Sequence, residues 1–455
     1  MTRKLDLPNI LNGLSREELV QLLLQATELD ESFKNTLLMK YTQVDPAGHV
    51  QACKRRMKAI VRKYTGREGF IPYRETYSFS MELLEMLDEM KDAKDHGLAL
   101  EVTILVLQEG VEAFQYADDS DGNVGMVVEG ALARIRDLAS GSVNDPVASS
   151  RIFERLLAFS ERDIFDGWED YRIELLEICT GLVRAEELRD RLKTAIKRHI
   201  AAHANDPYGK YTAEALLKLL FQLIREYGSS ADAERFVKEH LHYSFFRQHA
   251  IEACIDSGDA RGAIELALDG ERQDQQLPGL VTQWKKARYE AYRKLALKKE
   301  QRQLAWELLL GGDYAYYQEL VSITEGGKEE LYREVVAGLK QRDNWQARAV
   351  YLQLIADKND LEEMMAYVRA TPSAVETYAA RLSERYPEEM ARMYGDAIHR
   401  TAESASDRKG YRGVCKMISR YQKIFGQASQ AEIVLQLQAA YSRKPAFLDE
   451  LSKVE

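Results

Sequence analysis

Proline and glycine are scarce in this chain: 9 of its 455 residues are proline and 27 are glycine. An all-β protein of this length needs many more turn residues, because each strand has to be followed by a tight turn. The composition therefore favours a helical protein. At 455 residues the chain is also longer than one hydrophobic core usually supports, so we expect two or three domains or one extended repeat array.

Cysteine is also scarce, and the four cysteines lie far apart. Cys53, Cys179, Cys254 and Cys415 form no CxC or CxxC pair. This spacing excludes a dense disulfide framework and a zinc site built from neighbouring thiols. We expect buried free thiols in a reducing compartment.

Long apolar runs and net positive charge are both absent. No run approaches the roughly 18 apolar residues of a membrane span, and Asp6, Pro8, Asn9 and Asn12 break up the N-terminal segment where a signal peptide would lie. The net charge is −10, which argues against a globally basic nucleic-acid binder. A cytoplasmic protein without a membrane partner is expected.

Amphipathic helical patterns fill nearly every segment that remains. Ser15 and Glu18 form a capping box ahead of the apolar run LVQLLLQ. The Asp-Pro pairs at 45–46 and 145–146 each place a proline at the first position of a predicted helix. Only VTILVLQ, at 102–108, could be mistaken for a strand.

A weak internal repeat runs through the second half. The segments SGDARGAIELAL, GGDYAYYQELVS and KNDLEEMMAYVR begin around Asp259, Asp313 and Asp360. If these aspartates are helix N-caps, the residues four, seven and eight positions later form one apolar face on the second helix of a hairpin. Those residues are Ala263, Leu266, Ala267, Tyr317, Leu320, Val321, Met364, Tyr367 and Val368.

The irregular spacing of these repeats is typical of divergent tetratricopeptide-like (TPR-like) or HEAT-like arrays. The expected fold class is therefore all-α, with antiparallel helical hairpins stacked into a solenoid-like array. We expect an N-terminal arm at 1–13, an N-terminal helical domain at 14–206 and a TPR-like helical-repeat domain at 207–455. The boundary is placed in the segment 202–211, which contains HANDPYGKY and has no Ser/Gly-rich or Pro-rich run long enough for a flexible linker.

The stretch QYADDSDGNVG, at 115–125, has some features of a calcium loop. An EF-hand loop has ligands at positions one, three and five, glycine at six and glutamate at twelve. With Gly122 at six, Ala117 stands at one and Val128 at twelve, so the first and last ligands are missing. The preferred interpretation is an inter-helix turn in which aspartate side chains cap the next helix.

No catalytic signature is found. His199 and His203 are four apart, as in helical metal sites, but HIAAH lacks the glutamate and no third ligand is identifiable. Phosphate loops, GxSxG elbows and GxGxxG fingerprints do not occur. We therefore expect no enzymatic activity, no cofactor and no metal.

A basic stripe lies in CKRRMKAIVRKY, at 53–64. Its cations are Lys54, Arg55, Arg56, Lys58, Arg62 and Lys63. They could contact nucleic-acid phosphates or an acidic partner. They could equally pair with the acidic helices that follow at 76–121, or stay solvated.

Aromatic residues gather in the second half, where helical spacing indicates core packing for most of them. Tyr314, Tyr316 and Tyr317 cannot all face inward. We expect at least one of these three tyrosines to be exposed and available for contact.

Several of these segments carry a family resemblance. FQYADDSDGNVG, FERLLAF, GWEDYRIELLEIC and HAIEACIDSGDARGAIELALDGE, with LPGLVTQWKKARYEAY and the C-terminal tail, resemble the helical region that accompanies the zinc finger of bacterial SWIM-family proteins. The resemblance covers residues 14–455 and implies a helical fold with DDSDGNVG as a turn between two long helices. The CxC…CxH finger itself is missing, so its zinc and its binding activity do not carry over.

The expected function is a non-enzymatic helical-repeat scaffold for protein–protein interaction. A protein partner is expected and its identity is open. The alternative is association with nucleic acid through the basic stripe at 54–63. An enzyme whose site is assembled from distant residues has no support in the sequence.

Overall fold

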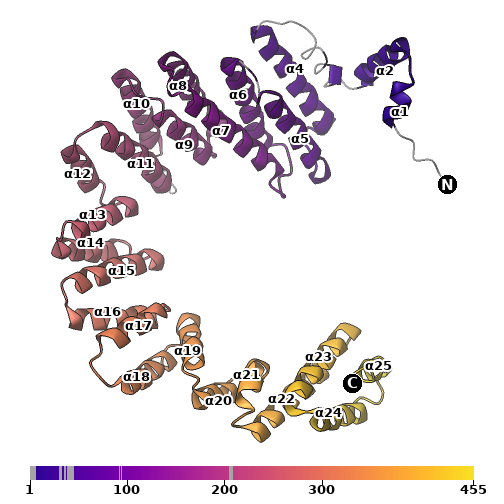
Figure 1. Cartoon of the computed structure of the whole chain (residues 1–455), viewed down its shortest axis with the longest axis vertical. Helices are drawn as coiled ribbons and strands as arrows, with labels where there is room; N and C mark the ends of the chain where they lie inside the picture. The colour runs from indigo at the N-terminus through magenta and orange to yellow at the C-terminus, as the bar shows by residue number, and fades with distance from the viewer. Residues whose placement is uncertain are drawn as a thin grey trace. The chain divides into compact units, whose positions relative to one another are not determined.

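The computed structural model describes residues 7–29, 33–34, 37, 46–91, 93, 95–203 and 209–454 (Figure 1). Every regular element in these ranges is a helix, so the predicted all-α class is confirmed. VTILVLQ lies inside a helix, and the pairing of Ile71 with Ala117 is the one isolated bridge among the described residues.

The chain forms two compact units, 1–245 and 246–455. The boundary predicted at 206/207 falls in 204–208, outside the described residues, and stays a prediction.

The first unit is a succession of helices joined mostly by short connections. In chain order these are α1 (Leu7–Asn12), α2 (Arg16–Leu29), α4 (Pro46–Thr65), α5 (Tyr73–Glu89), α6 (His96–Ala113), α7 (Asn123–Ser142), α8 (Pro146–Ser160), η1 (Asp163–Phe165), α9 (Glu169–Thr180), α10 (Glu186–Ala202), α11 (Gly209–Tyr227) and α12 (Ser230–Glu239). The unit boundary falls within α13 (Ser244–Asp256). From α4 to α11, helices contact both the next helix and the one after it, as α5 contacts α6 and α7. Figure 1 shows them side by side in chain order.

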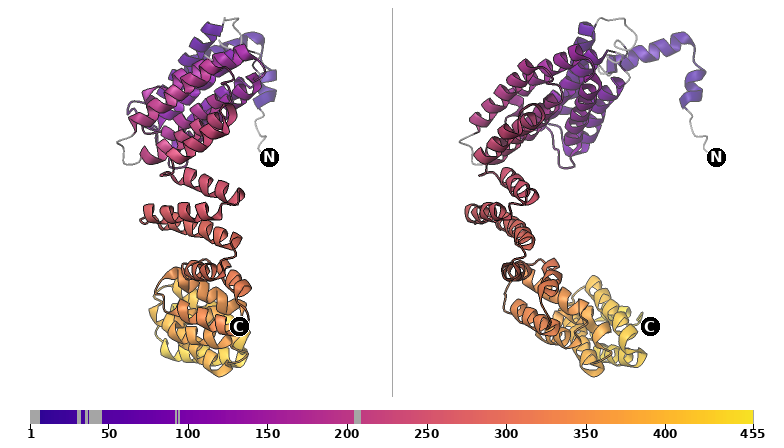
Figure 2. Two further views of the ribbon diagram at one scale, coloured as in Figure 1. Left: turned by 90° about the vertical axis from the view of Figure 1, so that its left-hand side faces the viewer. Right: turned by 60° about the vertical axis from the view of Figure 1, so that its left-hand side comes forward.

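The second unit continues with shorter helices. They are α14 (Ala260–Gln273), α15 (Pro278–Lys294), α16 (Lys298–Leu310), α17 (Ala315–Ile323), α18 (Lys328–Lys340), α19 (Trp345–Asp357), α20 (Leu361–Ala370), η2 (Pro372–Ala374), α21 (Val375–Leu382), α22 (Pro387–Ser404), α23 (Arg408–Phe425), α24 (Gln427–Ala440) and α25 (Pro445–Leu451). Extensive contacts between described helices again join near neighbours in the sequence. In Figure 2 the later helices, orange to yellow, pack together in one body.

Side-chain caps start several of these helices as the sequence predicts. The Ser15 hydroxyl accepts the N–H of Glu18 at 3.2 Å, and the Glu18 carboxylate accepts the N–H of Ser15 at 2.8 Å. Asp145 accepts two N–H groups at the start of α8. The other predicted cap, Asp45, lies outside the described residues.

The three repeat turns of the second unit share one backbone device. The residue before each aspartate has a positive φ: +84° at Gly258, +112° at Gly312 and +52° at Asn359. A left-handed residue reverses the chain and closes the preceding helix. Asp259 and Asp360 then cap α14 and α20, as predicted.

Asp313 departs from the pattern. Helix α17 begins at Ala315, so Tyr314 is the residue at the cap and the predicted cap at Asp313 is wrong by one position. The Asp313 carboxylate still accepts the N–H of Ala315 at 3.2 Å, and its second oxygen pairs with Lys286 at 2.7 Å. The ion pair with α15 holds this carboxylate beside the helix entry.

The predicted apolar face is confirmed at most of its positions. The residues four positions after each aspartate, Ala263, Tyr317 and Met364, are buried, and so is Leu320. Leu266 is only half-buried, at the edge of the small core around Trp284. Each of the three helices buries two of its three predicted residues and leaves one half-buried, namely Leu266, Val321 or Tyr367. Leu266 and Leu320 hold the same position after their aspartates, so they differ in burial alone.

This difference sets the cost of two matched substitutions. Leu320 is 0% exposed, so Leu320→Ala should lower the free energy of unfolding by about 2–5 kcal/mol. Leu266→Ala should cost about half as much, because less apolar surface returns to water. Urea denaturation measures both, and Leu435→Ala, at a position that is 65% exposed, is the control. Equal losses at Leu320 and Leu266 would contradict this burial pattern.

A second pair of variants tests the turns. Ala296 has a φ of +51° between α15 and α16, where its N–H donates to the carbonyl of Arg293 at 3.1 Å and the N–H of Leu297 donates to that of Tyr292 at 3.0 Å. Ala296→Gly should stabilise the protein by about 0.5–1 kcal/mol, because glycine adopts this conformation without strain. Gly258→Ala should destabilise the protein, because a Cβ added there meets nothing within 4 Å and only the positive φ opposes it. Thermal unfolding measures both variants. A change in melting temperature of the same sign in both would contradict the left-handed backbone at these two turns.

Candidate functional site

The predicted basic stripe lies on α4, where the helix divides its cations between two faces. Arg56 and Lys63 point toward α5: Arg56 Nη1 lies 2.6 Å from Glu89 Oε2, and Lys63 Nζ lies 2.6 Å from Glu82 Oε1. Arg56 is only 4% exposed. As a surface contact residue it is therefore a wrong prediction, because the register of α4 turns it into the α4–α5 interface.

The other four cations form an exposed face. Lys54, Arg55, Lys58 and Arg62 are all exposed, and no ion pair involves them in the part of the chain that the structure describes. At 100° per residue they fall within an arc of about 100° on α4. Internal pairing therefore explains two of the six residues, and four remain as an exposed basic surface, called the α4 basic face below.

The division predicts different outcomes for adjacent arginines. Arg56→Gln should lower the free energy of unfolding by about 1–2 kcal/mol, because it removes a buried cation from its carboxylates while Glu89 keeps access to water. Arg55→Gln, one residue away on the α4 basic face, should change it by less than about 0.5 kcal/mol. Urea denaturation of the two variants measures this difference. A larger loss of unfolding free energy in Arg55→Gln than in Arg56→Gln would contradict the placement of Arg56 in the α4–α5 interface and of Arg55 on the exposed face.

At least one of the tyrosines Tyr314, Tyr316 and Tyr317 was predicted to be exposed. Tyr317 is 1% exposed, so as a candidate contact residue it is wrong. Tyr314 and Tyr316 are half-buried. The Tyr314 hydroxyl donates to Asp357 at 2.6 Å, and the ring of Tyr316 packs edge-on against Tyr289 with centroids 5.0 Å apart. The helix turns all three toward neighbouring helices.

Several exposed aromatic residues were not predicted, and the largest of them is Trp345, which is 76% exposed. Asn344 caps α19 by accepting the N–H of Ala347 at 2.7 Å, which makes Trp345 the first helical residue. The cap signal was present in the sequence. Its consequence for Trp345 depends on the neighbouring helices, which the sequence does not place.

The aspartate cluster between α6 and α7 is used by the fold. Asp119 accepts the N–H groups of Val124 at 2.6 Å and Gly125 at 3.2 Å, at the start of α7. Asp118 accepts hydrogen bonds from the hydroxyl and the N–H of Ser120, and these bonds lower the pKa of Asp118. Asp121 accepts a hydrogen bond from the Tyr73 hydroxyl at 2.6 Å. These contacts, with φ of +72° at Gly122, fit the turn interpretation.

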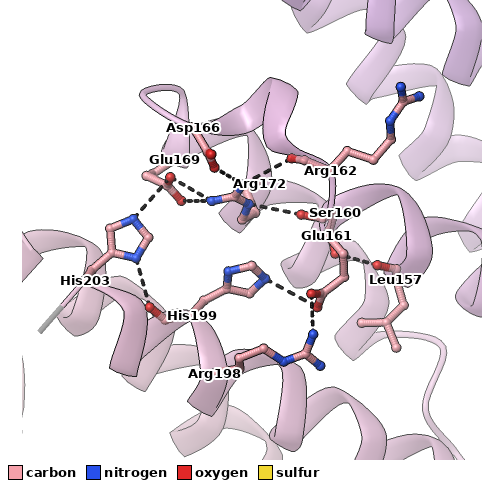
Figure 3. A network of polar contacts seen from close by, with 10 residues as sticks. All are labelled: Leu157, Ser160, Glu161, Arg162, Asp166, Glu169, Arg172, Arg198, His199 and His203. Carbon is pink, nitrogen blue, oxygen red and sulfur yellow. Dashed lines mark hydrogen bonds and ion pairs between the residues drawn. The ribbon is translucent and has the colours of Figure 1, made fainter.

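A polar network joins α8, η1 and α9 around Arg172 (Figure 3). Arg172 is 4% exposed. Its guanidinium donates to Glu169 at 2.6 Å, to Asp166 at 2.7 Å and to the carbonyls of Ser160 and Arg162 at 3.0 and 3.2 Å. A buried cation satisfied in this way fixes the three elements relative to one another.

His199 of α10 and His203, the residue that follows this helix, join the network through separate carboxylates (Figure 3). His203 Nε2 lies 3.2 Å from Glu169 Oε1, whereas His199 Nε2 lies 3.4 Å from Glu161 Oε1. Arg198 also pairs with Glu161, at 2.6 Å. Since the rings do not converge on one point, the spacing of four does not produce a shared metal position.

The groove beside this network offers no catalytic set. It encloses about 430 Å³ between α8 and α10, and Thr194 is the hydroxyl residue in its lining. That hydroxyl donates to the carbonyl of Asp190 at 2.7 Å, and Arg191 pairs with Glu154. The arrangement locks α8 to α10 through charges and presents no activated nucleophile.

Other features of the described ranges bear on function. No group of three His, Cys, Asp or Glu side chains there could hold a metal ion. Nor is any helix among those residues long and apolar enough to cross a bilayer. Cys53 and Cys179 are buried as expected, and burial raises the pKa of Cys53 to about 11, while Cys254 and Cys415 are half-buried.

Helix α2 differs from all the helices discussed so far. None of its residues is buried, although it carries a broad apolar face. Its exposed large apolar residues are Val20, Leu22, Leu23, Leu24 and Leu29. This set, called the α2 apolar face below, is a surface that water disfavours and that the described part of the chain leaves uncovered.

Comparison with known proteins adds no relative: no family model and no curated protein matches the chain. The resemblance to the helical region of SWIM-family proteins rests on the quoted segments and stays a prediction.

The histidine network predicts a pH dependence of stability. Burial, and then the charge of Arg172, hold the pKa of His199 below its ordinary value of 6.5. The unfolded chain binds the proton near pH 6.5 and the folded chain only at lower pH. The contribution of neutral His199 to the stability of the folded chain is therefore fully present above pH 6.5. It is lost as the pH falls below 6.5 toward the pKa of His199 in the folded chain.

His199→Gln should therefore reduce the fall in melting temperature between pH 7 and pH 5. His96→Gln, at an exposed histidine at the start of α6, should leave that fall unchanged. Thermal unfolding at a series of pH values measures both. An unchanged pH dependence in His199→Gln would show that His199 does not carry the effect.

Proposed function

We propose that this protein is a non-enzymatic helical scaffold that binds a protein partner. The observation that carries the proposal is the α2 apolar face. An amphipathic helix ordinarily holds its fold by burying its apolar side against other helices. In α2 that side is exposed, with Leu24 at 60% and Leu29 at 91%.

A protein surface is the occupant that suits this helix. The polar side of α2, with Glu17, Gln21, Gln25 and Glu28, gives it one soluble edge and one apolar face, as in helices that insert into a groove of a partner. The rest of the described chain fits a scaffold, because stacked helices present many exposed faces on a rigid support. The proposal includes a relationship to the helical region of SWIM-family proteins. That relationship implies a helical fold and transfers no catalytic residues to this chain.

A second candidate function is association with nucleic acid through the α4 basic face. The specific observation in its favour is that Lys54, Arg55, Lys58 and Arg62 are exposed and take part in no ion pair within the described ranges. Phosphate contacts of lysine and arginine supply most sequence-independent affinity for nucleic acids. The net charge of −10 works against this function at long range.

The scaffold function is tested by placing a photo-crosslinking amino acid at Leu23, on the α2 apolar face. In cells of the native host it should capture one defined protein. The same group at Gln25, on the polar side of α2, should capture none, because that side faces water. Capture of only a second copy of this chain at Leu23, or of nothing, would contradict the proposal.

Binding to the captured partner should then depend on the apolar side chains. Leu22→Asp with Leu23→Asp should weaken it at least 100-fold, because central apolar anchors dominate such interfaces. The matched control, Gln21→Asp with Gln25→Asp, adds the same charge to the polar side and should keep the affinity within a few-fold. Calorimetry with purified proteins measures both, and equal losses would point to charge rather than apolar contact.

The second candidate predicts that the protein shifts a nucleic-acid duplex in a gel at low salt. If the α4 basic face is the surface that binds the duplex, Lys54→Gln, Arg55→Gln and Lys58→Gln together abolish the shift, because they remove three of its cations. The control, Lys197→Gln, Lys210→Gln and Lys238→Gln, removes the same charge from elsewhere in the first unit and should retain it. A shift that survives the α4 variant would exclude this face as the binding surface.

A further inference from the structure

A second basic surface, which the sequence analysis did not identify, lies on α23 near the C-terminus. The helix contains six cations and no acidic residue. Five of the cations follow one another along the exposed side at intervals of three or four residues. They are Lys409, Arg412, Lys416, Arg420 and Lys423, and this set is called the α23 cationic stripe.

The stripe is narrow and straight. At 100° per residue its five members fall within an arc of about 80°, and at 1.5 Å per residue they span about 21 Å. The opposite side of α23 carries Tyr411, Val414, Ile418 and Tyr421, all buried against neighbouring helices. Burial of that side fixes the rotation of the helix, so the stripe is held outward on a rigid support.

Neighbouring carboxylates neutralise only part of the stripe. Arg412 lies 3.4 Å from Glu450, and Arg420 pairs with Glu376. Both arginines keep about 60% of their side chains exposed. Lys409, Lys416 and Lys423 take part in no ion pair in the described part of the chain.

The side chains between the cations decide which kind of polyanion fits. A protein interface is normally anchored by buried aromatic or apolar residues at its centre. The α23 cationic stripe contains none, because the exposed positions between its cations include Gly413 and no large apolar residue. A surface of regularly spaced positive charge without apolar anchors suits a phosphate backbone.

The same surface favours a duplex over a single strand. Unpaired bases are bound mainly by stacking on aromatic rings, and the tyrosines of α23, Tyr411 and Tyr421, are buried on its other side. A duplex presents its phosphates outward and needs no stacking partner. Over its length of about 21 Å the stripe passes several phosphates of a duplex, since each strand places one about every 3.4 Å along the axis.

We propose that the α23 cationic stripe binds the phosphate backbone of double-stranded nucleic acid without reading its sequence. DNA and RNA duplexes share this chemistry. The stripe adds a binding surface to the proposed scaffold function and does not depend on the α2 apolar face. It is also a different surface from the α4 basic face, which lies in the other unit.

The experiment uses the full chain and fluorescence anisotropy with labelled DNA and RNA duplexes of about 20 base pairs, over a range of salt concentrations. Wild type should bind both duplexes more tightly than a single strand of the same length. Lys409→Gln, Lys416→Gln and Lys423→Gln together should weaken binding at least tenfold. They should also reduce the slope of log K against log salt by roughly two to three, since each phosphate contact contributes about 0.9.

Two variants serve as controls. The first control removes the same charge from the second unit with Lys294→Gln, Lys299→Gln and Lys328→Gln. These lysines are exposed and take part in no ion pair within the described ranges, so this variant should keep wild-type affinity. Lys54→Gln, Arg55→Gln and Lys58→Gln should keep it too. The stripe lysines take part in no ion pair with any described residue, so the stripe variant should melt within a few degrees of wild type.

Four results would overturn the proposal. They are no binding by wild type at low salt, undiminished binding by the stripe variant, an equal loss in the Lys294, Lys299 and Lys328 control, and equal competition by a poly-glutamate peptide at matched charge. The last result would assign the stripe to an acidic protein segment. Loss in the α4 variant alone would move duplex binding to the α4 basic face.

Discussion

From α4 onward, the helices that the structure describes cover their apolar faces with helices that are close to them in sequence. The large core of the second unit shows the consequence: it runs from Tyr289 to Leu451 as a chain of contacts between successive helices. Tyr289 and Leu320 belong to the same core because α15 packs on α16 and α16 packs on α17. Stability is therefore built up locally, and the face of each helix that points away from its neighbours is left for other uses.

Charges between neighbouring helices follow the same logic. Most of the cations of α15 and α16 pair with nearby carboxylates; for example, Arg288 meets Glu271 at 2.7 Å, and Lys286 meets Asp313 at 2.7 Å. Such pairs add modest stability and fix which helix lies beside which. The lysines of the α23 cationic stripe differ from this pattern, because they follow one another along one exposed face and take part in no ion pair within the described ranges. They are the cations that we propose bind phosphate.

Much of the fold could be predicted from the sequence because its signals are local. The capping box at Ser15 and the caps at Asp145, Asp259 and Asp360 each depend on residues within one turn of a helix. The predicted cap at Asp313 was wrong by one position. One oxygen of Asp313 pairs with Lys286 on α15, a contact that the local sequence does not show. The half-burial of Leu266 likewise depends on how far the neighbouring helices extend over it.

The candidate surfaces were only partly predictable, for the same reason. Arg55 and Arg56 are adjacent in sequence, and only the position of α5 makes one exposed and the other buried. The apolar residues Cys53, Met57 and Ile60, all buried on α4, were the available signal for that rotation. On α23 the cations are separated by apolar residues, so they form no continuous basic run, and the stripe emerges only when they are placed on a helix.

Native-state hydrogen exchange of the whole wild-type chain, followed by mass spectrometry at increasing urea, tests most directly whether stability is built between neighbours. The account predicts that opening free energies differ between segments and change stepwise along the chain, with 46–245 and 246–454 opening separately. A single opening free energy shared by all protected segments would contradict it. The chain would then be one cooperative unit, and its exposed faces could not be treated as independent surfaces.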